Sequence, residues 1–235
     1  MPAETDCISQ CFDKCACAKG RRARPGQPVR GVSKALLDLI GADRLAGATL
    51  LEVGCGLGGL TREALARGVE RAQGVDLSPQ SIREASRLTA EPGLAERIMF
   101  AVGDGSQMDL GLHDVVVLDK VICCYPKVDA LLDRSLSVTG ETYAIVLPFS
   151  RGWRGALARL GIGVENGIRR VRHQSFRAFV HDVGGIETRI AEAGLRRIAA
   201  TRRFIWYVAV YGRSRGRSRR TGSSPSDSTR WRAFL

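Results

Sequence analysis

The sequence predicts an α/β fold with a mostly parallel sheet that is covered by helices on both faces. Short apolar runs alternate with helical patterns along residues 32–149, which is typical of βαβ units. The runs are nearly continuous rather than alternating, as expected for strands that are buried on both faces. A glycine-rich turn lies between the first run and the next helical pattern, an arrangement that brings backbone close to a ligand.

The individual elements follow from these patterns in chain order. A helix is expected before the sheet at 32–42, where apolar residues recur on one face and Gly41 lies near the end. Strands are expected at 48–53, 71–78, 97–104, 113–120 and 141–149. Helices are expected between them at 59–68, 78–91 and 127–138, and Pro79 suits the first turn of the second.

The last part of the pattern predicts a helix and a hairpin. The helix is expected at 185–194, and 195–213 is interpreted as two strands joined by a tight turn near Arg202–Arg203. One of these strands must then be antiparallel to its neighbour. The stretch 150–182 is too long for a simple crossover. We expect it to form a lid over the carboxyl ends of the strands, where open α/β sheets bind ligands.

The net charge of +12 is concentrated at the two ends of the chain. Residues 213–235 contain seven Arg and one Asp among Ser and Gly, a composition typical of disorder. We therefore divide the chain into a Cys-rich basic arm at 1–30, a catalytic domain at 31–212 and a disordered Arg/Ser-rich tail at 213–235. The tail is either a solvated segment or a weak, nonspecific binder of nucleic acid.

Seven cysteines, an odd number, argue against a disulfide framework. Cys7, Cys11 and Cys15 share one face of a helix if the arm forms one, so the arm is either a soft-metal site or inert. The inert arm is favoured, and no metal site is predicted. The polar N-terminus does not resemble a signal peptide, and no run has the length of a membrane span, so a cytoplasmic protein without a membrane span is expected.

The glycine loop in "LLEVGCGLGGLT" fits two cofactor patterns. Gly54, Gly56 and Gly59 satisfy G-x-G-x-x-G, the dinucleotide fingerprint. Glu52 with Gly54, Gly56 and Gly58 satisfies E-x-G-x-G-x-G, the methyl-donor loop of enzymes that use S-adenosylmethionine (SAM). The glycines alone do not decide between the two.

The acids at the following strand ends favour the second pattern. Asp76 ends the second strand, where a carboxylate accepts hydrogen bonds from ribose hydroxyls. Asp104 ends the third, where an acceptor suits the amino group of an adenine. Glu52 ends the first and can reach the amino-acid end of SAM. The neighbours Leu77 and Gly105 are included in the expected cofactor site.

This set of residues resembles the class I SAM-dependent methyltransferases over about 31–212. The resemblance implies SAM as cofactor and a Rossmann-like, seven-stranded, mostly parallel sheet whose final strand is antiparallel, with a lid insertion. "DVVVLDKVICCYP" and the later "FRAFVH" are similar, more loosely, to a bacterial group related to magnesium-protoporphyrin O-methyltransferases. The expected function is methyl transfer to a small-molecule acceptor, at oxygen.

Three residues are the candidates for catalysis. Asp119 and Tyr125 flank the stretch after the fourth strand, and Asp119 is also placed in the cofactor site, beside the methionine end of SAM. His181, in the expected lid, is preferred over His173 as a general base, since histidine titrates near pH 7. Arginines at 151, 154, 169, 170 and 172 make the lid basic and suit an anionic substrate. Cys123 and Cys124 are interpreted as small residues that line the pocket.

Several alternatives stay open on the sequence. An NAD(P)-dependent oxidoreductase explains the glycines but leaves Glu52 and Asp104 without a role. A non-catalytic nucleic-acid-binding protein would use the Arg-rich tail. Methylation of a thiophilic metalloid would require cysteine ligands at Cys123 or Cys124. The [DN]-P-P-[YF] motif of enzymes that methylate nucleobase or glutamine nitrogens is absent after the fourth strand, which counts against those acceptors.

Overall fold

A single seven-stranded sheet organises the protein in the computed structural model, which describes residues 4–91, 93–125, 128–174 and 176–213. The strand order is β3-β2-β1-β4-β5-β7-β6. The strands are β1 (Thr49–Val53), β2 (Arg71–Asp76), β3 (Ile98–Val102), β4 (His113–Asp119), β5 (Thr139–Pro148), β6 (Leu195–Arg203) and β7 (Trp206–Arg213). Neighbouring strands among β1 to β5 pair in parallel, and β7 pairs antiparallel with both β5 and β6.

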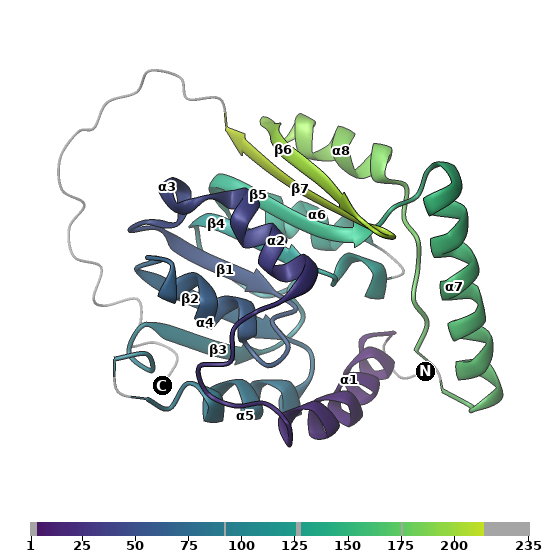
Figure 1. The fold of residues 1–235 in the computed structure, drawn as a ribbon, viewed down its shortest axis with the longest axis horizontal. Helices are drawn as coiled ribbons and strands as arrows, with labels where there is room; N and C mark the ends of the chain where they lie inside the picture. Colours follow the sequence, from purple (N-terminus) through teal and green to yellow (C-terminus); the bar gives the residue numbers. More distant parts are fainter. Residues whose placement is uncertain (1–3, 92, 126–127, 175, 214–235) are drawn as a thin grey trace.

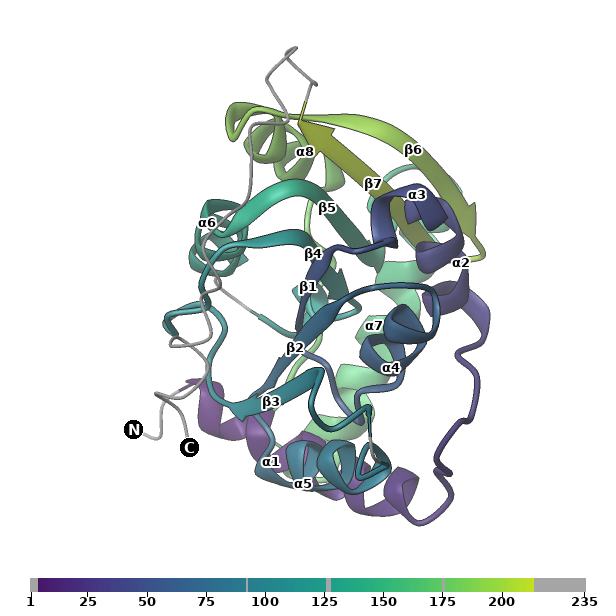
Figure 2. The same ribbon diagram turned by 90° about the vertical axis from the view of Figure 1, so that its left-hand side faces the viewer.

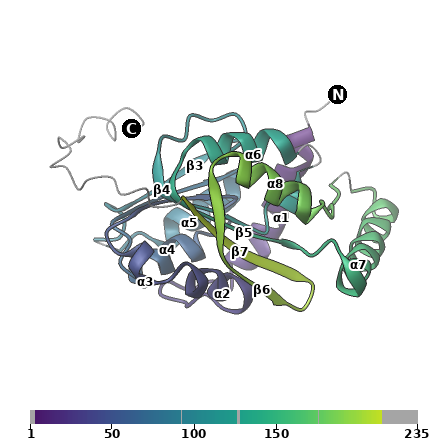
Figure 3. The same cartoon turned by 90° about the horizontal axis from the view of Figure 1, so that it is seen from above.

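Helices cover both faces of this sheet, as the sequence predicts (Figure 3). One face is covered by α2 (Gly31–Ile40), α3 (Ala42–Leu45) and α4 (Gly59–Ala66), and the other by α6 (Val128–Ser137) and α8 (Val183–Glu192). The helix α5 (Pro79–Leu88) packs against β2 and β3. Because both faces are covered, the central strands bury nearly every residue; the relative exposure of Leu50, Val117 and Val146 is 0%.

Two further helices lie beyond the carboxyl ends of the parallel strands (Figure 1). The arm forms a helix, α1 (Glu4–Gly20), which lies beside α5 in both side views (Figures 1 and 2). The expected lid consists largely of one helix, α7 (Gly152–Val171), at the edge of the molecule. A short 3-10 turn, η1 (Ile122–Cys124), follows β4.

The expected hairpin forms, with its turn immediately after Arg202–Arg203. Strand β6 continues through Arg202 and Arg203, and the reversal falls at Phe204–Ile205, where Phe204 has φ +53°. The two arginines keep their ladder partners Tyr207 and Trp206, so backbone pairing with β7 extends the strand past the charged pair. Most of the expected tail lies outside the described residues. Within the described ranges, no helix has the length and apolar character needed to cross a membrane.

Candidate functional site

A cavity of about 340 Å³ lies at the carboxyl ends of β1, β2 and β4. This is the edge of an open α/β sheet at which ligands bind. The glycine loop, Asp76 and the segment after β4 line it, and α1 lines the side that faces away from the sheet. The residues that the sequence assigned to the cofactor and that line the cavity are Glu52, Gly54, Gly56, Asp76, Leu77, Gly105 and Asp119.

The glycine loop requires glycine for two separate reasons. Gly54, Gly56 and Gly58 have φ of +75°, +54° and +67°, which side chains disfavour. A Cβ on Gly54 would lie 2.6 Å from the Val121 side chain, and one on Gly58 would lie 2.5 Å from Phe100. A Cβ on Gly56 would meet nothing within 4 Å. Gly54 and Gly58 therefore allow close packing, whereas Gly56 leaves open space where a ligand can approach the backbone.

Glu52 ties the glycine loop to the first turn of α4. Its carboxylate accepts a hydrogen bond from the backbone N–H of Thr61 at 3.0 Å and another from the Thr61 hydroxyl. An N–H in the first helical turn has no partner within the helix, so the carboxylate satisfies it. Burial raises the pKa of Glu52 to about 8. Glu52 is thus a structural anchor at the floor of the cavity as well as a lining residue.

Asp76 fixes the opposite side of the loop. One carboxylate oxygen accepts from the Gly56 N–H and the other from the Ser78 N–H, both at 2.8 Å. Burial raises the pKa of this carboxyl. Gly105 lies nearby, where a Cβ would approach Val53 to 2.4 Å. The carboxylate that follows β2 is thereby held at the cavity in a fixed orientation.

Asp104 does not line the cavity, although Gly103 and Gly105 on either side of it do. Its carboxylate accepts hydrogen bonds from the N–H and hydroxyl of Ser106 at 2.9 and 2.7 Å and from Gln107 at 3.1 Å. The Tyr125 hydroxyl donates a fourth at 3.1 Å. Asp104 therefore organises its own turn and positions Tyr125, which does line the cavity.

Asp119, Lys120 and Ser33 form a polar group at the end of β4. The Lys120 ammonium donates to Asp119 at 2.7 Å and to the Ser33 hydroxyl at 2.6 Å, and that hydroxyl donates to Asp119. Lys120 has φ +61°, an uncommon conformation for a residue with a side chain. Ser33 and Lys120 line the cavity with Asp119, so both charges are present where β4 ends.

The N-terminal helix contributes a wall of the cavity that the sequence analysis missed. The lining residues of α1 are Ile8, Phe12, Cys15, Ala16 and Lys19. Ile8 and Ala16 are buried, with relative exposures of 6% and 3%. Their spacing with Phe12 is the helical repeat of four, a signal that was present in the sequence beside the cysteine repeat at 7, 11 and 15.

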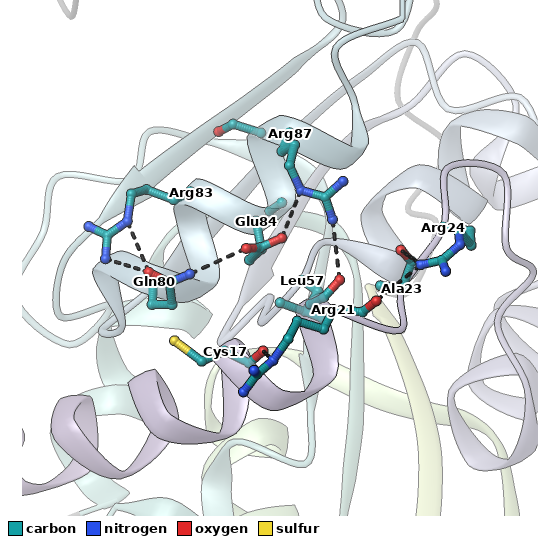
Figure 4. A network of polar contacts seen from close by, with 12 residues as sticks. Cys17, Arg21, Ala23, Arg24, Leu57, Gln80, Arg83, Glu84 and Arg87 are labelled. Atoms are coloured by element: carbon teal, nitrogen blue, oxygen red, sulfur yellow. Dashed lines mark hydrogen bonds and ion pairs between the residues drawn. The ribbon is translucent and has the colours of Figure 1, made fainter.

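Polar contacts hold α1 on the β2–α5 junction. The Ser9 hydroxyl donates to the Leu77 carbonyl at 2.9 Å, and Asp13 accepts from the Ser78 hydroxyl at 2.6 Å and the Gln80 N–H at 3.0 Å. At the end of α1, the Gly20 carbonyl accepts a hydrogen bond at 3.3 Å from the guanidinium of Arg87, a residue of α5 (Figure 4). The same guanidinium forms an ion pair with Glu84 of α5 at 2.9 Å. The helix is thus attached along its length.

The other side of α1 meets the segment around α7. The rings of Phe12 and Phe176 pack edge to face with centroids 5.5 Å apart. The Arg169 guanidinium lies over Phe176 at 4.9 Å and donates to the Cys11 thiol at 3.1 Å. Within the described residues, no residue of 150–182 lines the cavity, whereas five of α1 do. The segment 150–182, which was expected to be a lid, therefore contacts α1 and not the cavity itself.

The two histidines of 150–182 do not face the cavity. His181 Nε2 lies 2.8 Å from the Tyr125 carbonyl oxygen, and the residue lines a separate depression with α6 and α8. Burial lowers the pKa of His181. His173 is exposed just after α7, with φ +53°. The structure therefore brings Tyr125 and Asp119 to the cavity and leaves His181 behind Tyr125.

The cysteine pair after β4 is buried. The thiols of Cys123 and Cys124 lie 3.3 and 3.7 Å from the Lys120 carbonyl oxygen, and Cys124 lines the cavity together with Cys15 and Cys55. Across the part of the chain that the structure describes, no three His, Cys, Asp or Glu residues are grouped to bind a metal ion. The side chain of Cys7 lies outside the described side chains.

Part of the chain matches a known protein family. Residues 50–140 match a family model described as a methyltransferase domain. With the strand order, this match identifies the fold as that of the class I SAM-dependent methyltransferases, which confirms the fold class and the resemblance expected from the sequence. The same matches support the expected enzyme class and SAM as its cofactor.

Solved structures resemble most of the chain. Magnesium protoporphyrin IX methyltransferase from Synechocystis PCC 6803, with bound S-adenosylhomocysteine (SAH), superposes with a TM-score of 0.68 at 18% identity. The alignment covers 90% of this chain and 100% of that one. Its form with bound SAM gives a TM-score of 0.66 at 17% identity. At these identities the likeness concerns the fold.

Curated relatives match over shorter stretches. Ribosomal protein L11 methyltransferase from Serratia proteamaculans is 37% identical over 93 residues, which is 35% of this chain and 31% of the relative. Ajmaline N-methyltransferase from Rauvolfia serpentina is 33% identical over 70 residues, 29% of this chain and 24% of the relative. The chain thus spans about a third or less of these relatives, and their names give different acceptors.

Proposed function

We propose that the protein transfers a methyl group from SAM to a small-molecule acceptor, at an oxygen atom, and that the cavity beneath α1 is its active site. The observation that supports this proposal best is the enclosure of the glycine loop, Asp76 and Asp119 in one cavity at the edge of the sheet. The domain division at residues 30 and 212, with 150–182 as a lid, remains a prediction.

The residues that line the cavity fit the chemical parts of SAM. Gly56 leaves open backbone beside the Asp76 carboxylate, which suits ribose hydroxyls as hydrogen-bond donors. Asp119 and Lys120 offer both charges to a group that has both an amino and a carboxylate end. The apolar side chains of Leu77 and Phe12 supply walls for a flat ring. Asp104 contributes indirectly, by accepting a hydrogen bond from Tyr125, which lines the cavity. Glu52 contributes by anchoring the glycine loop to Thr61 of α4.

The lining residues favour an acceptor that needs no general base. The described cavity contains no histidine, and burial raises the pKa of the Tyr125 hydroxyl. A carboxylate acceptor is already ionised at pH 7, and the ammonium groups of Lys19 and Lys120 would attract it. We therefore propose an anionic acceptor that is methylated at a carboxylate oxygen. Under this proposal Tyr125 and Asp119 do not transfer a proton; they orient the acceptor and the methionine end of SAM.

SAM, when bound, supplies an electrophilic methyl group on a positively charged sulfur. The task of the protein is then to align the acceptor with that methyl and to exclude water. Asp119, held by Ser33 and Lys120, fixes one end of the cavity, and Tyr125, held by Asp104, fixes another. The apolar side chains of α1 that line the cavity, Ile8 and Phe12, would help to exclude water from it.

A calorimetric titration tests the cofactor part of this proposal. We expect SAM and SAH to bind the purified chain with micromolar dissociation constants, and NAD(P)H not to bind. Asp76→Ala should weaken SAH binding by roughly tenfold to a hundredfold, since it removes charge-assisted hydrogen bonds worth about 1.5–3 kcal/mol. Asp43→Ala, an exposed acid on α3, is the matched control and should bind as wild type does.

The same titration distinguishes the alternatives. Binding of NAD(P)H without SAM would favour the oxidoreductase, and no binding of either would favour a non-catalytic protein. Once SAM binding is established, the wild type can be incubated with SAM and a set of carboxylates, phenols and amines. Methyl esters in the products would support the anionic acceptor, whereas N-methylated products would overturn the oxygen assignment while leaving the cofactor assignment intact.

A further inference from the structure

The helix α7 has a continuous apolar stripe on its outer side. Large apolar side chains recur every three or four residues along its length, and they are exposed; the relative exposures of Trp153, Leu160 and Val171 are 69%, 65% and 80%. This spacing places them on one face of a helix. The full stripe consists of Trp153, Leu157, Leu160, Val164, Ile168 and Val171.

The opposite side of α7 is the side that attaches it to the protein. Gly155 and Ala158 are buried, and a Cβ on Gly155 would lie 2.3 Å from the Ser150 backbone. The Asn166 side chain donates to the Ala178 carbonyl at 2.8 Å and accepts from its N–H at 2.9 Å. In Figures 1 and 3, α7 lies at the periphery, apart from the sheet. The apolar stripe therefore points away from the body.

Arginines border the stripe on both sides. At 100° per residue, Arg154 and Arg172 lie on one flank, and Arg170 lies on the other. Among the described residues, these three form no ion pair with a carboxylate, while Glu165, the one acid of α7, pairs with Arg169. Arg159 points back to the body, where it donates to the Ser150 carbonyl at 2.8 Å. Long arginine side chains can extend past an apolar face to reach a polar layer.

More positive charge lies at the Trp153 end of the helix. A shallow pocket there of about 810 Å³ is lined by Arg151, Arg154, Arg197 and Arg202, together with aromatic side chains. Arg202 lies over the ring of Phe149 at 4.8 Å. Trp153 is thus bordered by arginine from both α7 and β6, the mixture of indole and cations that is favoured at membrane interfaces.

We infer that α7 is an interfacial helix that binds the surface of an anionic phospholipid membrane, with its apolar stripe among the upper acyl chains and its arginines at the headgroups. An apolar face bordered by Arg and ending in Trp is typical of helices that lie in the plane of a membrane. Cations near an anionic leaflet are attracted to it. The inference does not depend on the reaction that the cavity performs.

The charge pattern disfavours a second copy of this chain as the occupant. Two stripes in contact would bring arginines of both helices together on both flanks, and like charges there oppose pairing. The helix also cannot span the bilayer, since none of the described helices is apolar enough to do so. Attachment in the plane of the membrane satisfies both the stripe and the charges.

Vesicle flotation with the full chain tests the inference. We expect wild-type protein to float with vesicles of phosphatidylcholine and phosphatidylserine, to float much less with phosphatidylcholine alone, and to dissociate at high salt. The variant Leu160→Gln/Val164→Gln/Ile168→Gln should bind the anionic vesicles at least about tenfold more weakly, because binding scales with the buried apolar area. Leu112→Gln, a change at an equally exposed apolar residue far from α7, is the matched control.

Further measurements keep the result interpretable. The basic tail is identical in every variant, so a difference between them reports on α7. Circular dichroism and SAH titration establish that each variant is folded. Quenching of tryptophan fluorescence by brominated acyl chains should be strong in wild type and should fall in Trp153→Phe. Trp206 and Trp231 are present in both proteins, so the difference reports on Trp153.

Three results would overturn the inference. They are no binding of wild type to the anionic vesicles, equal binding of the triple variant, and a dimer on size-exclusion chromatography that the triple variant abolishes while vesicle binding is absent. The last result would assign the stripe to contact between copies of the chain.

Discussion

Asp13 of α1 accepts a hydrogen bond at 2.6 Å from the hydroxyl of Ser78, the residue that caps the N-terminus of α5. Ser78 itself accepts from the Ser81 N–H and lies two residues after Asp76, the last residue of β2. One short polar contact thus connects the N-terminal helix to the loop that presents the Asp76 carboxylate to the cavity. The closure of the cavity and the geometry of Asp76 are physically linked through this junction.

Asp13→Ala should loosen α1 from that junction. The Ser78 hydroxyl and the Gln80 N–H would lose their acceptor, at a cost of about 1 kcal/mol, as for other helix-capping contacts. We expect faster tryptic cleavage near Arg21 and Arg22 and weaker SAH binding, with little change in the unfolding of the sheet. Asp43→Ala is the control for cleavage, and unchanged cleavage in Asp13→Ala would contradict the linkage.

Two glycines of the same loop should respond differently to alanine. Gly58→Ala should destabilise the fold by more than about 1 kcal/mol, because it combines an unfavourable φ with a 2.5 Å approach to Phe100. Gly56→Ala meets no atom within 4 Å, so only the backbone cost is expected, together with a loss of SAH affinity. Urea unfolding and calorimetry separate these effects. If the two variants lost equal stability and Gly56→Ala kept its affinity for SAH, Gly56 would not lie beside the bound ligand.

The raised pKa of Glu52 predicts a pH dependence of stability. The folded protein retains the proton up to about pH 8, whereas the unfolded chain releases it near the ordinary value of 4.5. Between these values the folded state binds more protons, so its stability falls as the pH rises, by at most about 1.4 kcal/mol per pH unit. Glu52→Gln should flatten this slope in urea unfolding from about pH 5 to 8. Identical slopes in the two proteins would show that Glu52 ionises normally.

His181→Ala tests the role expected of this residue from the sequence. Because the ring contacts the Tyr125 carbonyl and lies outside the cavity, we expect SAH affinity to remain within about twofold and stability to fall by about 1 kcal/mol. A general base would instead lower turnover about 10²–10⁴-fold without altering stability. Comparison of turnover and unfolding for His181→Ala and Tyr125→Phe, on the same acceptor, separates the two roles.

The sheet was predictable because its strands and helices have strong, local signals. Continuous apolar runs such as Val115–Leu118 specify strands buried on both faces, and Ser78 with Pro79 specifies the start of α5. The positions of Gly54, Gly56 and Asp76 at the cavity follow from the rule that the carboxyl ends of parallel strands share one edge. These parts depend on residues close to one another in the sequence.

The parts that were missed depend on contacts between distant residues. The docking of α1 requires Asp13 to meet Ser78, 65 residues later, and no local pattern indicates that pairing. The orientation of Asp104 depends on Tyr125, and the placement of His181 depends on how the segment after α7 returns to the sheet. Sequence patterns named these residue types correctly but could not determine which of them face the cavity.

The cysteines of α1 offer a direct readout of how the cavity opens. Cys15 lines the cavity and is half-buried, whereas Cys17, two residues along the same helix, is exposed. An alkylating reagent should therefore label Cys17 at a constant rate and label Cys15 only when α1 separates from the loop below it. The ratio of the two rates, followed by peptide mass spectrometry, would report the frequency of ligand exchange without any engineered probe.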